Sequence, residues 1–179
     1  MNKNIVAFGA SNSKNSINSQ LANFAANQVE NATVNSLNLN DFEMPIYSID
    51  REMKSGIPAE AIAFKEEIKN ADAIIISFAE HNGSYSVAFK NIYDWISRIE
   101  QNVWMNKPMF LMATSPGGYG AKTVLNHATG IFKRSNSNTV LSFSLPSFMQ
   151  NFNESGIVNK DLATEFNSLL TEFSQALNN

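Results

Sequence analysis

The sequence predicts an α/β fold in which a five-stranded parallel sheet lies between two layers of helices. Short apolar runs alternate along the chain with longer segments of helical periodicity, a pattern typical of repeated βα units. Residues 73–78 and 109–113 are apolar almost throughout, as expected of strands buried on both faces. A chain of 179 residues with 44% hydrophobic residues has the size of about one domain, which we expect to span residues 1–179.

Apolar runs of strand length occur at five places: residues 5–8, 34–39, 73–78, 109–113 and 139–143. Five such runs fit the flavodoxin-like strand order 2-1-3-4-5, in which strands 1, 3 and 4 are neighbours. Ligands of these sheets bind beyond the carboxyl ends of the strands. The segments that follow the first, third and fourth runs are therefore the first places to look for a site.

Helices are predicted where apolar residues recur at helical spacing. Three such stripes contain Leu21, Phe24, Ala25 and Val29; Ala88, Ile92, Trp95, Ile96 and Ile99; and Leu162, Phe166, Leu169, Leu170, Phe173 and Leu177. The third stripe predicts a carboxy-terminal helix packed along one face of the sheet. Residues 40–57, around Pro45 and Gly56, are predicted to form an irregular functional loop.

The composition favours a small-molecule partner over a polymer or a membrane. Lysine and arginine number 13 against 16 aspartates and glutamates, and this balance of -3 predicts neither nucleic-acid nor anionic-lipid binding. No apolar run approaches the length of a membrane span, and the amino-terminal run is shorter than the core of a secretory signal. The absence of cysteine excludes a thiol nucleophile and an iron–sulfur cluster, and we expect no metal site. A cytoplasmic location is the default expectation.

The segment after the first strand has the chemistry of a phosphate loop. It runs into a helix that begins near Ser16, so main-chain N–H groups at Ile17 and Asn18 and the positive end of the helix dipole would face a ligand. The hydroxyls of Ser11, Ser13 and Ser16 and the amide of Asn18 would add donors. Alternatively, Ser16 is only the N-cap of the helix and the other serines are ordinary loop residues.

The segments after the third and fourth strands are rich in turn-forming residues. Asn82-Gly83 is a turn signal, and the polar groups around it belong to Glu80, His81 and Ser84. Segment 115–118, Ser115-Pro116-Gly117-Gly118, would let the backbone approach a ligand closely because glycine lacks a Cβ. Either segment alone could be an ordinary βα turn. Together, the three segments could contact one ligand.

Motifs in all three segments resemble those of the NADPH-dependent FMN reductase family of flavodoxin-like flavoproteins. Residues 10–18 are similar to the family's Gly-Ser-x-Arg-x-x-Ser-x-Asn loop, with Ala10 in place of glycine and Ser13 in place of arginine. Residues 79–95 resemble Pro-Glu-Tyr-Asn-Gly-Ser-x-Pro-Gly-x-Leu-Lys-Asn-x-x-Asp-Trp, with His81 at the tyrosine. Lys107-Pro108 and residues 115–118 match the family's Lys-Pro and Ser-x-Gly-Gly motifs.

This resemblance implies an FMN whose phosphate lies on residues 11–18 and whose ring lies between residues 79–84 and 115–118. NADPH or NADH would pass a hydride to flavin N5, and a quinone, free flavin or similar acceptor would then take the electrons in a ping-pong cycle. No side chain is assigned as a catalytic acid or base. The family resemblance also implies a homodimer or homotetramer.

Two alternatives stay open at the level of sequence. The chain could be a flavin-binding electron carrier or sensor that acts through a protein partner without nicotinamide. It could also be a member of the fold that has lost FMN, given Ala10 and Ser13. Nucleotide hydrolysis and Rossmann-type dehydrogenation are excluded because neither Gly-x-x-x-x-Gly-Lys-[Ser/Thr] nor Gly-x-Gly-x-x-Gly occurs.

Overall fold

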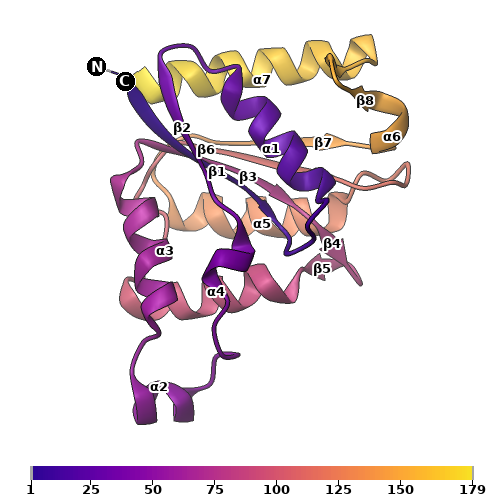
Figure 1. The fold of residues 1–179 in the computed structure, drawn as a ribbon. Coiled ribbons are helices and arrows are strands. Elements are labelled where there is room, and N and C mark those ends of the chain that lie inside the picture. Colours follow the sequence, from indigo (N-terminus) through magenta and orange to yellow (C-terminus); the bar gives the residue numbers. More distant parts are fainter. Residues whose placement is uncertain (1, 179) are drawn as a thin grey trace.

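A five-stranded sheet forms the centre of the molecule, which this computed structural model describes over residues 2–178 (Figure 1). Its strands are β1 (Lys3–Ala10), β2 (Ala32–Ser36), β3 (Ala73–Phe78), β6 (Met109–Thr114) and β7 (Val140–Leu145). The strands are hydrogen-bonded in the order β2-β1-β3-β6-β7, and every pair is parallel. Counted along the sheet's own strands, this is the order 2-1-3-4-5, so the predicted flavodoxin-like topology is confirmed.

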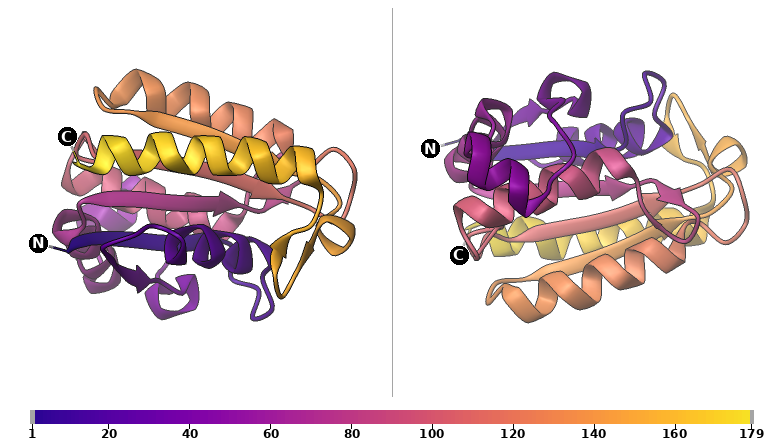
Figure 2. Two further views of the ribbon diagram at one scale, coloured as in Figure 1. Left: turned by 90° about the horizontal axis from the view of Figure 1, so that it is seen from above. Right: turned by 90° about the horizontal axis from the view of Figure 1, so that it is seen from below.

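Helices cover both faces of the sheet (Figure 2). One face packs against α1 (Ile17–Asn27) and α7 (Lys160–Asn178), and the other packs against α3 (Ala59–Asn70), α4 (Val87–Ile99) and α5 (Lys122–Ser135). Alternate strand residues serve the two layers: Ile5 of β1 packs toward α1 and α7, and Val6 packs toward the opposite layer. Every residue of β3 and β6 is buried, which confirms the interpretation of their uninterrupted apolar runs.

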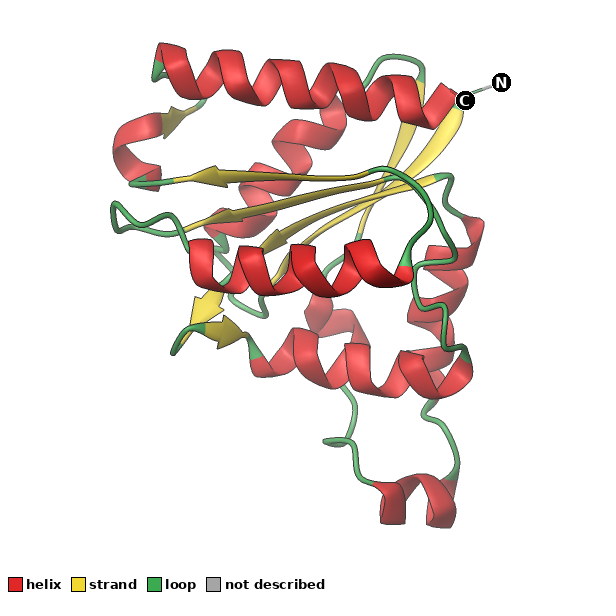
Figure 3. Cartoon of the chain, turned by 180° about the vertical axis from the view of Figure 1, so that it is seen from behind, coloured by secondary structure: helices red, strands yellow, loops and turns green. Residues whose placement is uncertain are grey.

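Short elements occupy the connections between the layers. They are η1 (Leu39–Phe42), α2 (Ile49–Ser55), the hairpin of β4 (Glu80–His81) and β5 (Ser84–Tyr85), α6 (Phe148–Asn151), and the hairpin of β8 (Phe152–Asn153) and β9 (Gly156–Ile157). Figure 3 shows the β4–β5 hairpin at the end of the sheet to which the strand arrows point. None of the helices within residues 2–178 combines the length and the apolar character needed to cross a membrane.

The segment predicted to be irregular, residues 40–57, contains two short helices instead. Helix α2 begins after Ser48, whose side chain accepts a hydrogen bond from the Arg51 N–H, and ends at Gly56 with a φ of 73°. It projects away from the sheet (Figure 1) and buries none of its residues, so its sequence carries no apolar stripe for a periodicity argument to find. Helix α3 also lacks a clear stripe because Lys65 belongs to its buried face.

Candidate functional site

The three predicted segments meet at the carboxyl edge of the sheet. The ends of β1, β3 and β6 are adjacent there, with Ala10 paired to Phe78 and Phe78 to Ala113. A cavity of about 220 Å³ lies at this edge. We call it the loop cavity; it is lined by Ser11, Ser13, Asn15, Ser16, Ile17, Asn18, Ala79, Glu80, His81, Thr114, Ser115 and Pro116.

The first segment presents several hydrogen-bond donors to the loop cavity. Ser16 is the N-cap of α1, and its Oγ accepts a hydrogen bond from the Ser19 N–H at 3.1 Å. The Oγ of Ser11 accepts one from the Ser13 N–H, also at 3.1 Å. Because both hydroxyls act as acceptors, their own hydrogens are available to a ligand. The N–H groups of the first helical turn have no partner inside the helix and carry its positive dipole end, an arrangement that suits phosphate.

Gly9 allows the start of α1 to lie directly against the end of β1. A Cβ on Gly9 would come within 2.4 Å of both the N and the Oγ atoms of Ser19. No side chain fits in that space, so the close approach of helix and strand depends on glycine. This close contact fixes the position of the first turn of α1 relative to the end of β1, and therefore relative to the loop cavity.

The Asn18 side chain has a structural role beside the one expected for it. Its Oδ1 accepts hydrogen bonds from Ser77 Oγ at 2.7 Å and from the Thr114 N–H at 3.1 Å, and its Nδ2 donates to the Thr114 carbonyl at 3.2 Å. These bonds link α1 with β3 and β6. Asn18 also lines the loop cavity, and the second hydrogen of its Nδ2 stays available to a ligand.

The second segment folds as the β4–β5 hairpin. Asn82 and Gly83 both have positive φ angles, 52° and 74°, as a type I′ turn requires, so the turn signal is confirmed. Glu80 anchors the hairpin, because its Oε2 accepts a hydrogen bond from the Val124 N–H at 2.9 Å in the first turn of α5. Glu80 and His81 line the loop cavity, whereas Asn82, Gly83 and Ser84 do not.

The third segment is tied to the chain that follows β7. The Gly117 carbonyl accepts hydrogen bonds from Ser115 Oγ at 3.2 Å and from the Ser147 N–H at 2.9 Å. Ser115 and Pro116 line the loop cavity, but Gly117 and Gly118 do not. Asn15 and Ala79 also line the cavity; they lie within the predicted ranges 11–18 and 79–84 but were not named as contacts. Sequence reasoning missed Thr114, which directly precedes the third segment.

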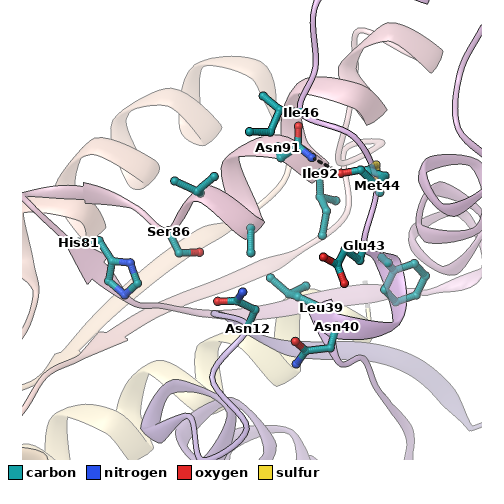
Figure 4. Close-up of a pocket in the computed structure, with 13 residues that line it drawn as sticks. Asn12, Leu39, Asn40, Glu43, Met44, Ile46, His81, Ser86, Asn91 and Ile92 are labelled. Carbon is teal, nitrogen blue, oxygen red and sulfur yellow. Dashed lines mark hydrogen bonds between the residues drawn. The ribbon is translucent and has the colours of Figure 1, made fainter. Parts of the chain in front are cut away.

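A second cavity, of about 280 Å³, opens beside the hairpin (Figure 4). We call it the arm cavity because one wall comes from residues 39–46, which lead into α2; the remaining lining comes from Asn12, His81, Ser86, Val87, Ala88, Asn91 and Ile92. Asn91 holds this wall in place. Its Nδ2 donates to the carbonyls of Met44 and Pro45 at 3.1 and 3.2 Å, and its Oδ1 accepts from the Tyr47 N–H at 2.8 Å. His81 is common to both cavities.

Neither cavity is lined by lysine or arginine among the described residues. The position where the resembling family has arginine is Ser13, and the adjacent Lys14 lines neither cavity. The acidic side chains present are Glu80 in the loop cavity and Glu43 in the arm cavity. No group of three or more residues of metal-binding type is found within residues 2–178.

The fold and the loop cavity place this chain among the flavodoxin-like α/β proteins that carry a serine-rich loop at the carboxyl edge of the sheet. The chain belongs to the NADPH-dependent FMN reductase family, whose model matches residues 3–150. The resemblance seen in the three sequence motifs is thereby confirmed.

Curated relatives match part of the chain. It is 38% identical over 89 residues to a 2-hydroxy-1,4-benzoquinone reductase from Burkholderia sp, covering 49% of this chain and 48% of that protein. It is 32% identical over 85 residues to a quinone reductase from Escherichia coli (strain K12), covering 48% and 45%. The matched region thus spans about half the length of these curated relatives.

Solved structures match over almost the whole chain. A flavoenzyme NAD(P)H:(acceptor) oxidoreductase from Paracoccus denitrificans superposes with a TM-score of 0.76 at 22% identity, covering 98% of this chain and 97% of that one. An azoreductase from Bacillus anthracis str. Sterne superposes with a TM-score of 0.64 at 16% identity, covering 99% of both chains. At these identities the superpositions show the shared fold.

Proposed function

We propose that this chain binds FMN and catalyses the reduction of a small quinone-type acceptor by NADPH or NADH. The observation that carries the proposal is that two cavities lie next to each other and share His81 as a lining residue. One cavity has the donors that a phosphate requires, and the other is an open, partly apolar space beside it. Family membership and the names of the curated relatives support the same activity.

The residues of the loop cavity fit FMN. The hydroxyls of Ser11, Ser13 and Ser16 and the first N–H groups of α1 would hold the phosphate, as the sequence motif implies. Segments 79–84 and 115–118 would hold the ring, and their main-chain N–H groups would stabilise negative charge on it. Bound FMN supplies two-electron chemistry, taking a hydride from a nicotinamide and returning the electrons to an acceptor.

The overall reaction balances without any net gain or loss of a proton by a protein side chain. NAD(P)H, a proton and a quinone give NAD(P)⁺ and a hydroquinone: the dihydronicotinamide loses a hydride, and the quinone gains two electrons and two protons. The nicotinamide ring of the donor and the acceptor would use the arm cavity in turn, because it is the space that adjoins the loop cavity at His81. Sequential occupation of one cavity would allow the proposed ping-pong cycle.

The proposal includes assembly into a homodimer or homotetramer. Ile46 and Val87 line the arm cavity, yet they are 64% and 70% exposed. A second copy that covered these side chains would also close the cavity to water. Sedimentation equilibrium of the purified protein tests the assembly. The cytoplasm is the proposed location because it supplies NADPH and NADH, and cell fractionation tests this location.

Absorbance and rapid kinetics test the proposed function directly. The purified protein should show a flavin spectrum, or acquire one when FMN is added, and stopped-flow mixing with NADPH or NADH should bleach it on a catalytic timescale. Addition of 1,4-naphthoquinone should then restore the flavin absorbance. A flavin-loaded protein that neither nicotinamide reduces would refute the reductase and favour the electron carrier. A protein that binds no FMN would refute both.

A further inference from the structure

We propose that Glu43 makes the arm cavity select uncharged acceptors over anionic ones. This inference rests on the proposed function, since it assigns the arm cavity to the acceptor. It concerns the charge of the acceptor, which neither the family nor the relatives' names specify for this chain.

The lining of the arm cavity suits a flat, neutral molecule with carbonyl oxygens. Leu39, Met44, Val87 and Ile92 supply apolar surface, and the polar side chains of the lining are amides, a serine hydroxyl, an imidazole and one carboxylate. Both Nδ2 hydrogens of Asn91 are used within the wall, but the Asn12 amide and the His81 imidazole can donate N–H groups to quinone oxygens without a formal charge. No lysine or arginine lines the cavity among the described residues, so the positive potential that a negative substituent would meet is that of the start of α4, at Ser86, Val87 and Ala88.

Glu43 is the carboxylate of this lining, and Figure 4 shows its side chain directed toward the interior of the cavity, close to Leu39 and Ile92. Within residues 2–178, Glu43 takes part in none of the side-chain hydrogen bonds or ion pairs. Its charge is therefore not neutralised by a neighbour, in contrast to Glu52, which pairs with Arg98 at 3.0 Å. Glu43 is itself exposed, and it lines the cavity, so an anion that entered the cavity would come close to an unpaired carboxylate and be repelled by it.

The neighbouring Asp41 provides a matched control. It lies two residues away and, like Glu43, is exposed, but it does not line the arm cavity. Glu43→Gln and Asp41→Asn each remove one negative charge and preserve the size of the side chain. A change in net charge alone affects both variants equally, whereas a local effect within the cavity affects only Glu43→Gln.

The test uses flavin-loaded protein that has been reduced in advance with one equivalent of dithionite, so that no nicotinamide is present. Reoxidation by 1,4-naphthoquinone and by its 2-sulfonate is followed by stopped flow. In each case the quinone takes up two electrons and two protons. Glu43→Gln should raise the second-order rate constant for the sulfonate, relative to the neutral quinone, by at least about fivefold, since repulsion at contact distance amounts to about that factor even when well screened. Asp41→Asn should leave this ratio unchanged.

Two further measurements separate charge from structure. In oxidised wild-type protein, calorimetry should show tighter binding of hydroquinone than of 2,5-dihydroxybenzoate, and Glu43→Gln should reduce that difference. Raising the salt concentration to about 0.5 M should also reduce it, because salt screens charges across an open cavity. An unchanged sulfonate-to-quinone ratio in Glu43→Gln, or an equal change in Asp41→Asn, overturns the inference while the proposed function stands. Failure of the protein to bind flavin overturns both.

Discussion

Replacement of Asn18 by alanine should destabilise the whole domain, because this side chain links three elements of the fold. The substitution removes the hydrogen bonds to Ser77 and to the main chain of Thr114, at 2.7, 3.1 and 3.2 Å. Ser77 and Thr114 are 0% and 1% exposed, so the substitution leaves buried polar groups without their partner. Three buried hydrogen bonds contribute about 0.5–1.5 kcal/mol each, and the orphaned groups add a desolvation cost, which gives a loss of about 3–5 kcal/mol.

Urea unfolding followed by tryptophan fluorescence measures this loss, with Asn27→Ala as the control. The Nδ2 of Asn27 also donates to a carbonyl, that of Asn23 at 2.8 Å, but this bond lies at the exposed end of the same helix. We expect Asn27→Ala to lower the free energy of unfolding by less than about 0.5 kcal/mol. A loss below about 1 kcal/mol for Asn18→Ala would refute the view that the Asn18 side chain holds α1 against β3 and β6.

Three further variants test the proposed phosphate site and the packing around it. Ser16→Asp keeps a good N-cap but places a carboxylate beside the proposed phosphate, so FMN affinity, measured by fluorescence titration, should fall about tenfold or more while the urea midpoint stays near that of the wild type. Gly9→Ala should lower the free energy of unfolding by about 1–3 kcal/mol, because its Cβ would meet Ser19 at 2.4 Å; an unchanged midpoint would contradict this. Burial raises the pKa of Tyr85 above its ordinary value of 10.0. The neutral form of Tyr85 therefore contributes fully to stability below about pH 10, and this contribution is lost as the pH rises toward the pKa of the folded state. Between pH 8 and about pH 10.5, the urea midpoint of Tyr85→Phe should fall less than that of the wild type.

The fold was predictable because its strongest signals are local. The apolar runs of β3 and β6 are uninterrupted since both of their faces are buried, and the stripes of α1, α4 and α7 each face one hydrophobic layer. Helix α2 was missed for the opposite reason. None of its residues is buried, so its sequence needs no stripe of apolar residues at helical spacing.

The loop cavity was predictable from topology, but the arm cavity was not. Parallel strands bring their carboxyl ends together, so any polar segments that follow β1, β3 and β6 must meet. The arm cavity depends instead on a long-range contact, in which the Asn91 side chain fixes the backbone of residues 44–47. Such a side-chain-to-backbone pairing leaves no periodic trace in the sequence. The dual use of Asn18 was hidden for the same reason.

On the proposed function, the two cavities would treat negative charge differently. With Ser13 where the family has arginine, the loop cavity has no lysine or arginine among its described lining residues, and a phosphate would meet hydroxyls, side-chain amides, main-chain N–H groups and a helix dipole. These donors act over short distances and in fixed directions, so they favour an anion seated at the start of α1 and add little attraction elsewhere. The arm cavity is also lined by a helix start, that of α4 at Ser86, Val87 and Ala88, but its lining includes the carboxylate of Glu43. On the proposed function, a cationic side chain at position 13 would attract anionic acceptors as well as the phosphate, whereas Glu43 would oppose a negative charge in the arm cavity.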